Sequence, residues 1–180
     1  KGLVANILFL SESEFVKPKL GDRRKTLAIS MWAQYFLDNY ATVDEAVDDM
    51  RKEKFYVVPT NIPGQDRQAG MHLALSDSTG DSAIFEYIGG KLKIYHSRDY
   101  RVMTNSPEYS QQLAITSYWD EIGGTKFLPG TNRAADRFAR ASFYVDAVPK
   151  VASNTEAMFI VLSIMRNVSV PIGISTPDQP

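Results

Sequence analysis

The sequence of 180 residues contains no cysteine and only two histidines, His72 and His96. Without a thiol, these residues form no disulfide and no thiolate metal site, and they hold no cysteine nucleophile. Two histidines are also too few for a histidine-rich zinc site. We therefore expect neither a metal ion nor another cofactor.

The chain also lacks a long hydrophobic run and an excess of charge of either sign. Its longest apolar stretches, Leu3–Leu10 and Ala157–Met165, are far shorter than the roughly 20 residues of a membrane-spanning helix. Its 20 basic and 21 acidic residues are interspersed, so no basic stripe indicates nucleic acid or anionic lipid. We expect no membrane insertion, no nucleic-acid partner, and a small molecule as the binding partner.

The pattern of apolar residues predicts helices and strands in separate runs. Leu3–Leu10 is continuously apolar, which is typical of a strand buried on both faces, although a short buried helix gives the same pattern. Helical spacing predicts a helix over Ile29–Leu37, and the capping box Thr42–Glu45 begins a second one. Further strands are expected at Lys54–Val58, Met71–Ser76, Ser82–Ile88, Lys91–His96 and, more briefly, Arg101–Met103.

Turn and cap signals complete this outline. Gly89-Gly90 predicts a tight hairpin, because glycine tolerates the positive φ that a two-residue turn requires. Two later helices are expected at Ala134–Val145 and Thr155–Asn167, the second with a capping box that begins at Ser153. Helices, then antiparallel strands, then helices indicate an α+β layered fold. Because no linker or repeat divides the chain, we expect a single domain over residues 1–180.

Chemical motifs are scarce: the sequence has no phosphate loop, His-Glu-x-x-His pattern, Gly-x-Ser-x-Gly elbow or dinucleotide fingerprint. Polar residues at strand ends remain as candidates, since a strand end holds a side chain rigidly and leaves its tip accessible. Asn105 follows the expected strand Arg101–Met103 and is either a site residue or a turn former before Pro107. Arg137 either binds a carboxylate or carbonyl or is an ordinary solvated arginine on its helix.

The other titratable residues have structural interpretations. His72 lies between apolar neighbours and His96 ends a strand, so we interpret both as structural histidines. The acidic residues of the second helix are interpreted as its solvated face rather than as a metal site; they are Asp44, Glu45, Asp48 and Asp49.

Five short segments occur in an order that matches one known family. They are the strand-like Gly2–Leu10, the Thr-Asn-x-Pro segment Val102–Pro107, the Leu-Pro-Gly turn Phe127–Gly130, the Arg-Phe-x-Arg helix Arg137–Arg140 and the strand-like Val170–Gly173. Each motif is short, but their order and separations are compatible over nearly the whole chain. The set resembles the choloylglycine hydrolase and penicillin V acylase family of N-terminal-nucleophile hydrolases.

The resemblance implies a fold and a mechanism. The fold is an αββα four-layer sandwich, present in part, with two stacked antiparallel sheets between helical layers. An N-terminal cysteine attacks the amide carbonyl, and its own α-amine is the general base. The resulting oxyanion needs preorganised donors. By the resemblance, these are the side-chain amide of Asn105 and the backbone N–H of Phe9, and Arg137 lies beside the nucleophile.

The cysteine, and the arginine and aspartate that follow it in the family, belong upstream of Lys1. We therefore expect the 180 residues to be a fragment, the central part of the amidase domain, inactive alone. A buried strand that begins near residue 2 would otherwise lack its sheet neighbours. The alternative is a truncated, non-enzymatic paralogue that only binds acyl groups.

Substrate expectations also follow from the resemblance. Phe9 stands where bile salt hydrolases carry Asn and penicillin acylases an aromatic residue, which favours penicillin V-like or N-acyl homoserine lactone-like amides over conjugated bile salts. An aromatic wall suits phenoxyacetyl or fatty-acyl groups through apolar burial. The loop Thr60–Gln68 resembles the family's substrate loop, where Ile62 and Pro63 would line the acyl pocket, or it is an ordinary surface loop.

Ser11–Glu14 resembles the Gram-negative branch of the family. The resemblance therefore implies a bacterial protein that assembles as a homotetramer. It also implies a periplasmic rather than a cytoplasmic location.

Overall fold

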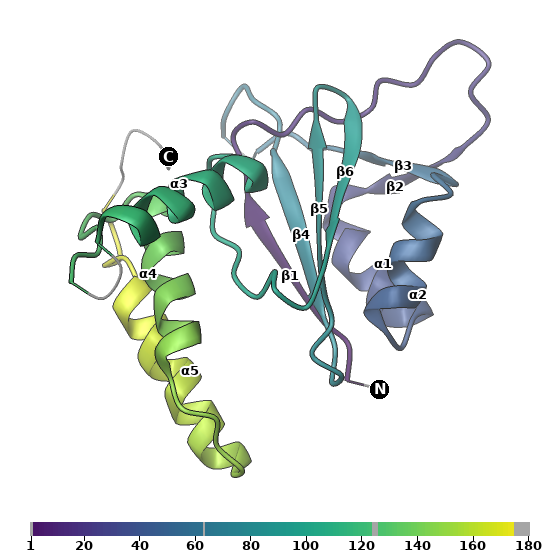
Figure 1. Ribbon diagram of the computed structural model, residues 1–180. Coiled ribbons are helices and arrows are strands. Elements are labelled where there is room, and N and C mark those ends of the chain that lie inside the picture. The colour runs from purple at the N-terminus through teal and green to yellow at the C-terminus, as the bar shows by residue number, and fades with distance from the viewer. Residues whose placement is uncertain (1, 63, 124–125, 175–180) are drawn as a thin grey trace. The chain divides into compact units, whose positions relative to one another are not determined.

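The computed structural model describes residues 2–62, 64–123 and 126–174 (Figure 1). These residues divide into two compact units, one that ends at Tyr100 and one that begins at Arg101. The first unit contains all the strands and two α-helices, and the second contains three further helices. The expected α+β class is therefore confirmed, whereas the single domain over residues 1–180 stays a prediction.

A four-stranded antiparallel sheet forms the centre of the first unit (Figure 1). Its strands, in spatial order, are β1 (Val4–Phe9), β4 (Met71–Ser76), β5 (Ser82–Ile88) and β6 (Lys91–His96). The turn between β5 and β6 is Gly89-Gly90, with φ angles of 58° and 70°. These positive angles explain why two glycines stand there and confirm the predicted hairpin.

Helices α1 (Trp32–Asn39) and α2 (Val43–Met50) supply the apolar layer that covers one face of this sheet. A short 3-10 helix, Ile29–Met31, precedes α1. Phe36 of α1 stacks on Phe85 of β5 with ring centroids 5.6 Å apart, and both rings are fully buried. Burying one such side chain contributes roughly 1.5–3 kcal/mol, so this contact joins the helices firmly to the sheet.

Two strands form a separate parallel pair, which differs from the expected antiparallel run. They are β2 (Lys25–Ala28) and β3 (Phe55–Val58), in register from Lys25 opposite Phe55 to Ala28 opposite Val58. Parallel neighbours need a crossover connection, and here α1 and α2 lie between the two strands in the sequence. The strand β2 was missed because it is short and lies directly after a charged, loop-like stretch.

Further expectations for strands are corrected, among them Val170–Gly173, which is irregular with a turn at Ile172 and Gly173. Leu3–Leu10 does form β1, but Val4 is 50% exposed, so the strand is not buried on both faces; among the described residues β1 is an edge strand. Arg101–Met103 is irregular and pairs with no strand of the described chain. Its Arg101 side chain instead forms an ion pair with Asp146.

The second unit consists of α3 (Tyr109–Ile122), α4 (Ala134–Ala147) and α5 (Asn154–Val168). Helices α4 and α5 confirm the two later helices predicted from the sequence, and Ser153 caps α5 by accepting from the Glu156 N–H. Helix α3 was not predicted. Its Tyr109 packs edge-on against Phe138 of α4, with both rings buried and their centroids 5.7 Å apart.

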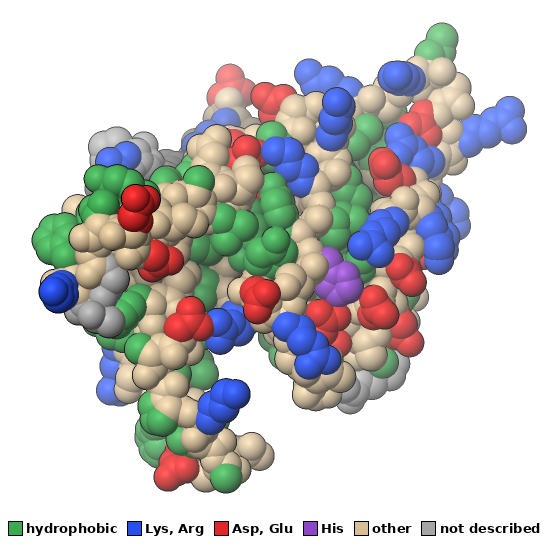
Figure 2. Space-filling model, viewed as in Figure 1, with side chains coloured by type: hydrophobic (Ala, Val, Ile, Leu, Met, Phe, Trp, Pro, Cys, Tyr) green, Lys and Arg blue, Asp and Glu red, His purple; other side chains and the backbone are tan. Residues whose placement is uncertain are grey.

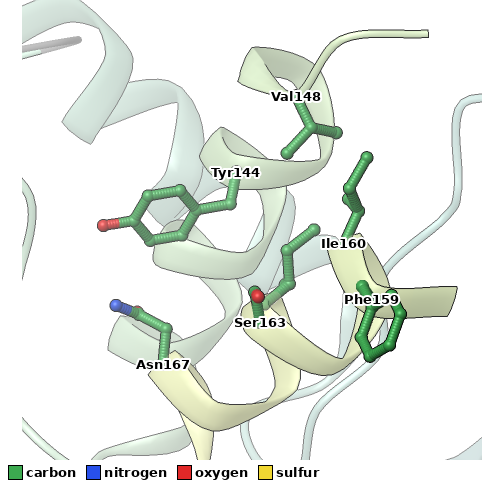
Figure 3. Close-up of a pocket in the computed structure, with 7 residues that line it drawn as sticks. Tyr144, Val148, Phe159, Ile160, Ser163 and Asn167 are labelled. Carbon is green, nitrogen blue, oxygen red and sulfur yellow. The ribbon is translucent and has the colours of Figure 1, made fainter. Parts of the chain in front are cut away.

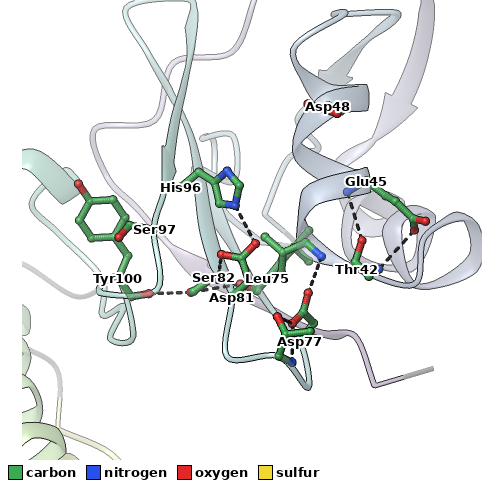
Figure 4. Close-up of polar contacts among 12 residues, drawn as sticks. Thr42, Glu45, Asp48, Leu75, Asp77, Asp81, Ser82, His96, Ser97 and Tyr100 are labelled. Carbon is green, nitrogen blue, oxygen red and sulfur yellow. Dashed lines mark hydrogen bonds and ion pairs between the residues drawn. The ribbon is translucent and has the colours of Figure 1, made fainter.

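The beginning of α2 is held by two sets of hydrogen bonds (Figure 4). The predicted capping box is confirmed, because Thr42 and Glu45 exchange bonds between side chain and backbone. In addition, the Asp77 carboxylate accepts from the Val43 N–H at 2.9 Å, which ties the helix to the β4–β5 turn. Hydrogen bonds from Thr79 and then from the Val43 N–H hold the pKa of Asp77 below its ordinary value.

We predict that Asp77→Asn lowers stability at pH 7 by about 0.3–1 kcal/mol, because the amide oxygen can still accept from the Val43 N–H but lacks the negative charge that favours a helix N-terminus. Because the folded-state pKa of Asp77 is lowered, its contribution is present above the unfolded value of about 3.9 and is lost as the pH falls through the folded value. The difference between wild type and variant in thermal unfolding should therefore stay constant from pH 7 to about pH 4 and shrink as the pH falls further. Asp66→Asn, at an exposed loop position, is the matched control. A difference that stays constant with pH would contradict this role of the carboxylate.

Candidate active site

Asn105 and Arg137, predicted separately from the sequence, contact each other in the second unit. Asn105 lies in a bend before α3, and Arg137 lies near the beginning of α4. The Arg137 Nη2 donates to Asn105 Oδ1 at 2.9 Å, and its Nε donates to the Asn132 carbonyl at 3.1 Å. Asn105 therefore follows an irregular segment rather than a strand, but it is still held by a specific partner.

The contact fixes the orientation of the Asn105 amide. A guanidinium has only donors, so the atom that faces Arg137 must be the carbonyl oxygen of the amide. The Nδ2 donor group consequently points away from Arg137. Asn105 is only half-buried, as a residue that meets a ligand would be.

Arg137 also brings positive charge to this place. The side chain is half-buried, so it does not lie as a fully solvated helix arginine would. Burial, and then the charge of Arg140, lower the pKa of Arg137. Its two described bonds both end on neutral carbonyl oxygens, so these partners do not cancel the charge.

The backbone around Asn105 is held by two buried polar residues that the sequence analysis did not identify. Gln112 of α3 donates from Nε2 to the Asn105 carbonyl at 2.6 Å and to the Pro107 carbonyl at 2.5 Å. The Thr104 hydroxyl lies 2.9 Å from both Gln112 Oε1 and the Ala134 carbonyl. Recognising Gln112 required α3, which the sequence analysis missed.

Phe9 lies at the end of β1, in the first unit. The Leu10 N–H donates to the Gly70 carbonyl at 2.9 Å, toward β4. Because successive amides of an antiparallel strand point to opposite edges, the Phe9 N–H points away from β4. Gly70 permits this pairing, since a Cβ at that position would lie 2.4 Å from the Leu10 carbonyl oxygen. The relation of Phe9 to Asn105 stays a prediction.

The Phe9 ring contacts the loop Thr60–Gln68 through Arg67, whose guanidinium lies 5.1 Å from the ring centroid. This loop folds back on itself, because the Ile62 N–H donates to the Arg67 carbonyl at 3.0 Å. The structure therefore joins Phe9 to the segment predicted to bind substrate. Ile62 is half-buried, and Pro63 lies outside the described residues. No sequence signal distinguished Arg67 from other exposed loop arginines.

Both histidines are paired with carboxylates. His72 Nδ1 lies 2.8 Å from Glu86 Oε1, and both side chains are fully buried. Among the described residues, the Nε2 of His72 has no hydrogen-bond partner. His96 Nε2 lies 2.8 Å from Asp81 Oδ2 in a more accessible position (Figure 4). The pairs agree with a structural interpretation of both histidines.

The acidic residues of α2 do not all lie on a solvated face. Asp49 is only 6% exposed; it accepts from Lys54 Nζ at 2.5 Å and from the Tyr35 hydroxyl at 3.2 Å. Asp44 is exposed and lies close to Asp81 and His96, with the potential ligand atoms of the three within 4.8 Å of one another. The hydrogen bond between His96 and Asp81 accounts for much of this proximity without an ion.

Two cavities lie apart from these residues. A groove of about 360 Å³ between α4 and α5 is lined mainly by apolar side chains, including Tyr144, Phe159 and Ile160 (Figure 3). A larger cavity of about 830 Å³ in the first unit lies beside Tyr56 and Gly90. Neither is lined by Asn105, Arg137 or Phe9.

The visible surface and the described helices bear on the expected partners. On the face shown in Figure 2, positively and negatively charged side chains lie among one another. Among the described helices, none combines the length and apolar character that crossing a bilayer requires.

Residues 1–179 match the family model described as linear amide C–N hydrolases, choloylglycine hydrolase family. A penicillin V acylase of Pectobacterium atrosepticum is 53% identical over 192 residues, which cover 100% of this chain and 51% of that protein. A bile salt hydrolase/transferase of Clostridium perfringens is 25% identical, over 77% of this chain and 48% of that protein. The chain thus spans about half the length of the curated relatives it matches, and these relatives are bacterial.

Solved structures agree with this assignment. A penicillin V acylase from Agrobacterium tumefaciens superposes with a TM-score of 0.87 at 54% identity, over 99% of this chain and 53% of that chain. A variant of conjugated bile acid hydrolase from Clostridium perfringens superposes with a TM-score of 0.77 at 20% identity, over 99% of this chain and 60% of that chain. This likeness shows a shared fold. The predicted resemblance and the fold of N-terminal-nucleophile hydrolases are confirmed. The chain belongs to the choloylglycine hydrolase family of linear amide C–N hydrolases.

Proposed function

We propose that this chain is the part of an amidase that supplies the oxyanion donors for hydrolysis of a linear amide bond. The observation that carries the proposal is the match of residues 1–179 to the amide hydrolase family. The attacking cysteine lies outside these 180 residues, which contain none. That the chain spans about half of its relatives supports this division of the catalytic residues.

Similarity to the relatives supports an acyl amide of the penicillin V type as the substrate. The chain is 53% identical to a penicillin V acylase but 25% identical to a bile salt hydrolase/transferase. The aromatic Phe9 and the loop that contacts it through Arg67 suit an apolar acyl group, with Ile62 and Pro63 as further wall residues. N-acyl homoserine lactones present a similar acyl amide, and conjugated bile salts are the alternative substrate class.

In the first step, the cysteine sulfur attacks the amide carbonyl and the α-amine of the same cysteine accepts the thiol proton. The Asn105 Nδ2 and the Phe9 N–H donate to the oxyanion that develops on the carbonyl oxygen. Collapse expels the amine, which takes the proton, and leaves an acyl thioester. Water then hydrolyses the thioester through a second oxyanion at the same donors.

Arg137 contributes in two ways to this proposal. Its hydrogen bond to Oδ1 turns the Nδ2 donor of Asn105 away from the guanidinium, which is the orientation that an oxyanion donor requires. Its positive charge, bonded to neutral carbonyls, favours the thiolate and the oxyanion over their neutral forms. Both effects act on charge that develops during the reaction.

A periplasmic location and a homotetramer belong to the same proposal and rest on the family resemblance. Helix α5 carries exposed apolar side chains, which favour burial against another part of the complete protein or against another copy. They are Met158, Phe159, Val161, Leu162 and Met165.

The proposal is tested by assaying the purified complete protein for release of phenoxyacetate from penicillin V, beside a glycine-conjugated bile salt. We expect turnover of penicillin V to exceed that of the bile salt, and alkylation of the cysteine with iodoacetamide to abolish both. Faster turnover of the bile salt would indicate that conjugated bile salts, rather than penicillin V-type amides, are the preferred substrates. Acyl binding without release of either product would support the non-enzymatic paralogue instead.

We predict that Asn105→Ala in the complete enzyme lowers kcat by roughly a hundredfold to a thousandfold, the usual cost of one oxyanion donor. The KM should change little, because the donor acts on charge that forms only in the transition state. Asn105→Asp is the control for a turn-forming role, since it keeps turn chemistry but replaces the donor with a charged acceptor. Near-normal turnover of the Asp variant would exclude the oxyanion role.

We predict that Phe9→Ala raises KM for phenoxyacetyl and long-chain acyl amides by about tenfold, because an aromatic side chain buries a large apolar area. The backbone N–H is kept, so kcat should fall less than in Asn105→Ala. Phe127→Ala, at an aromatic residue that is 60% exposed in the second unit, is the matched control. An unchanged KM across both substrates would remove the Phe9 ring from the acyl pocket.

A further inference from the structure

Gln112 is a fully buried polar residue inside an otherwise apolar helix contact. Its amide nitrogen lies within hydrogen-bond distance of two backbone carbonyls, those of Asn105 and Pro107. Its amide oxygen faces the Thr104 hydroxyl at 2.9 Å. Burying a polar amide costs free energy unless its groups are bonded, so this residue needs the partners it has.

We propose that Gln112 is a positioning residue for the oxyanion donor Asn105, an inference that rests on the proposed function. Its side chain holds the backbone on both sides of the Asn105–Pro107 segment. The main chain from which the Asn105 side chain extends is therefore restrained by these two hydrogen bonds. A displacement of about 1 Å at a reacting group lowers the rate by up to a hundredfold, so we expect loss of this restraint to lower kcat.

The residue type at position 112 follows from the chemistry of its partners. Two carbonyl oxygens must be met by two protons on one atom, which an amide NH₂ provides. An ionised carboxylate has no proton to donate, and an apolar side chain could donate to neither carbonyl. Glutamine also supplies the acceptor for Thr104 on the same group.

The same cluster joins the backbone of Asn105 to the helix that orients its side chain. The Thr104 hydroxyl has one proton, which it donates either to Gln112 or to the carbonyl of Ala134, the first residue of α4. Arg137 of α4 binds the Asn105 side chain. Contacts with α4 therefore position both the main chain and the side chain of Asn105.

The test is a double-mutant cycle on kcat in the complete enzyme, with Gln112→Met, Asn105→Ala and the double variant. Methionine keeps the length and helix propensity of glutamine but cannot donate. We expect Gln112→Met to lower kcat by roughly tenfold to a hundredfold with little change in KM. In the Asn105→Ala background the same substitution should cause no further loss, because its effect passes through Asn105.

Gln111→Met is the matched control, since Gln111 is the exposed neighbour on the same helix. It should leave kcat and KM unchanged. If Gln112→Met does not accumulate as folded protein, Thr104→Val replaces it in the cycle; it removes one hydroxyl while keeping side-chain volume. We expect a smaller loss of kcat, again absent in the Asn105→Ala background.

The outcomes separate this inference from the proposed function. Losses that multiply in the double variant, or a Gln112→Met enzyme with normal kcat, would overturn the positioning role while Asn105 remains the donor. A normal kcat in Asn105→Ala alone would overturn the oxyanion role itself, and the inference with it.

Discussion

The hydrogen bond from Arg137 to Asn105 is the contact on which the account of the site depends. A guanidinium cannot accept a hydrogen bond, so it selects one of the two orientations of the Asn105 amide. Without this bond the amide could turn and present its oxygen to a developing negative charge, which would repel it. One donor–acceptor contact between a bend and a helix therefore determines which end of the Asn105 amide is turned away from Arg137, and the proposed function requires that end to be the donor.

The irregular backbone at Asn105 explains why the helical unit contains buried polar residues. A helix or strand bonds its carbonyls within regular secondary structure, whereas two carbonyls of the Asn105–Pro107 segment accept hydrogen bonds from a side chain. Gln112 donates to the carbonyls of Asn105 and Pro107, and its amide oxygen lies within hydrogen-bond distance of the Thr104 hydroxyl. The half-buried Asn105 is thus backed by a buried polar network.

Local signals predicted much of the first unit, because the Gly89-Gly90 turn and the Thr42 capping box depend on neighbouring residues alone. The parallel partner of β3 was not predictable in this way, since its pairing depends on a crossover of two helices. Asn105 and Arg137 were identified through family motifs, but their contact was not. Gln112 and Arg67 carry no local signal and become recognisable only through the tertiary structure.

The most direct test is a crystal structure of the complete protein with an acyl aldehyde bound to its cysteine as a hemithioacetal, whose oxygen stands where the oxyanion forms. The account predicts that Asn105 Nδ2 lies about 2.7–3.1 Å from that oxygen while Oδ1 faces Arg137. A structure in which Oδ1 faces the hemithioacetal oxygen, or in which the amide lies beyond hydrogen-bond distance, would contradict it.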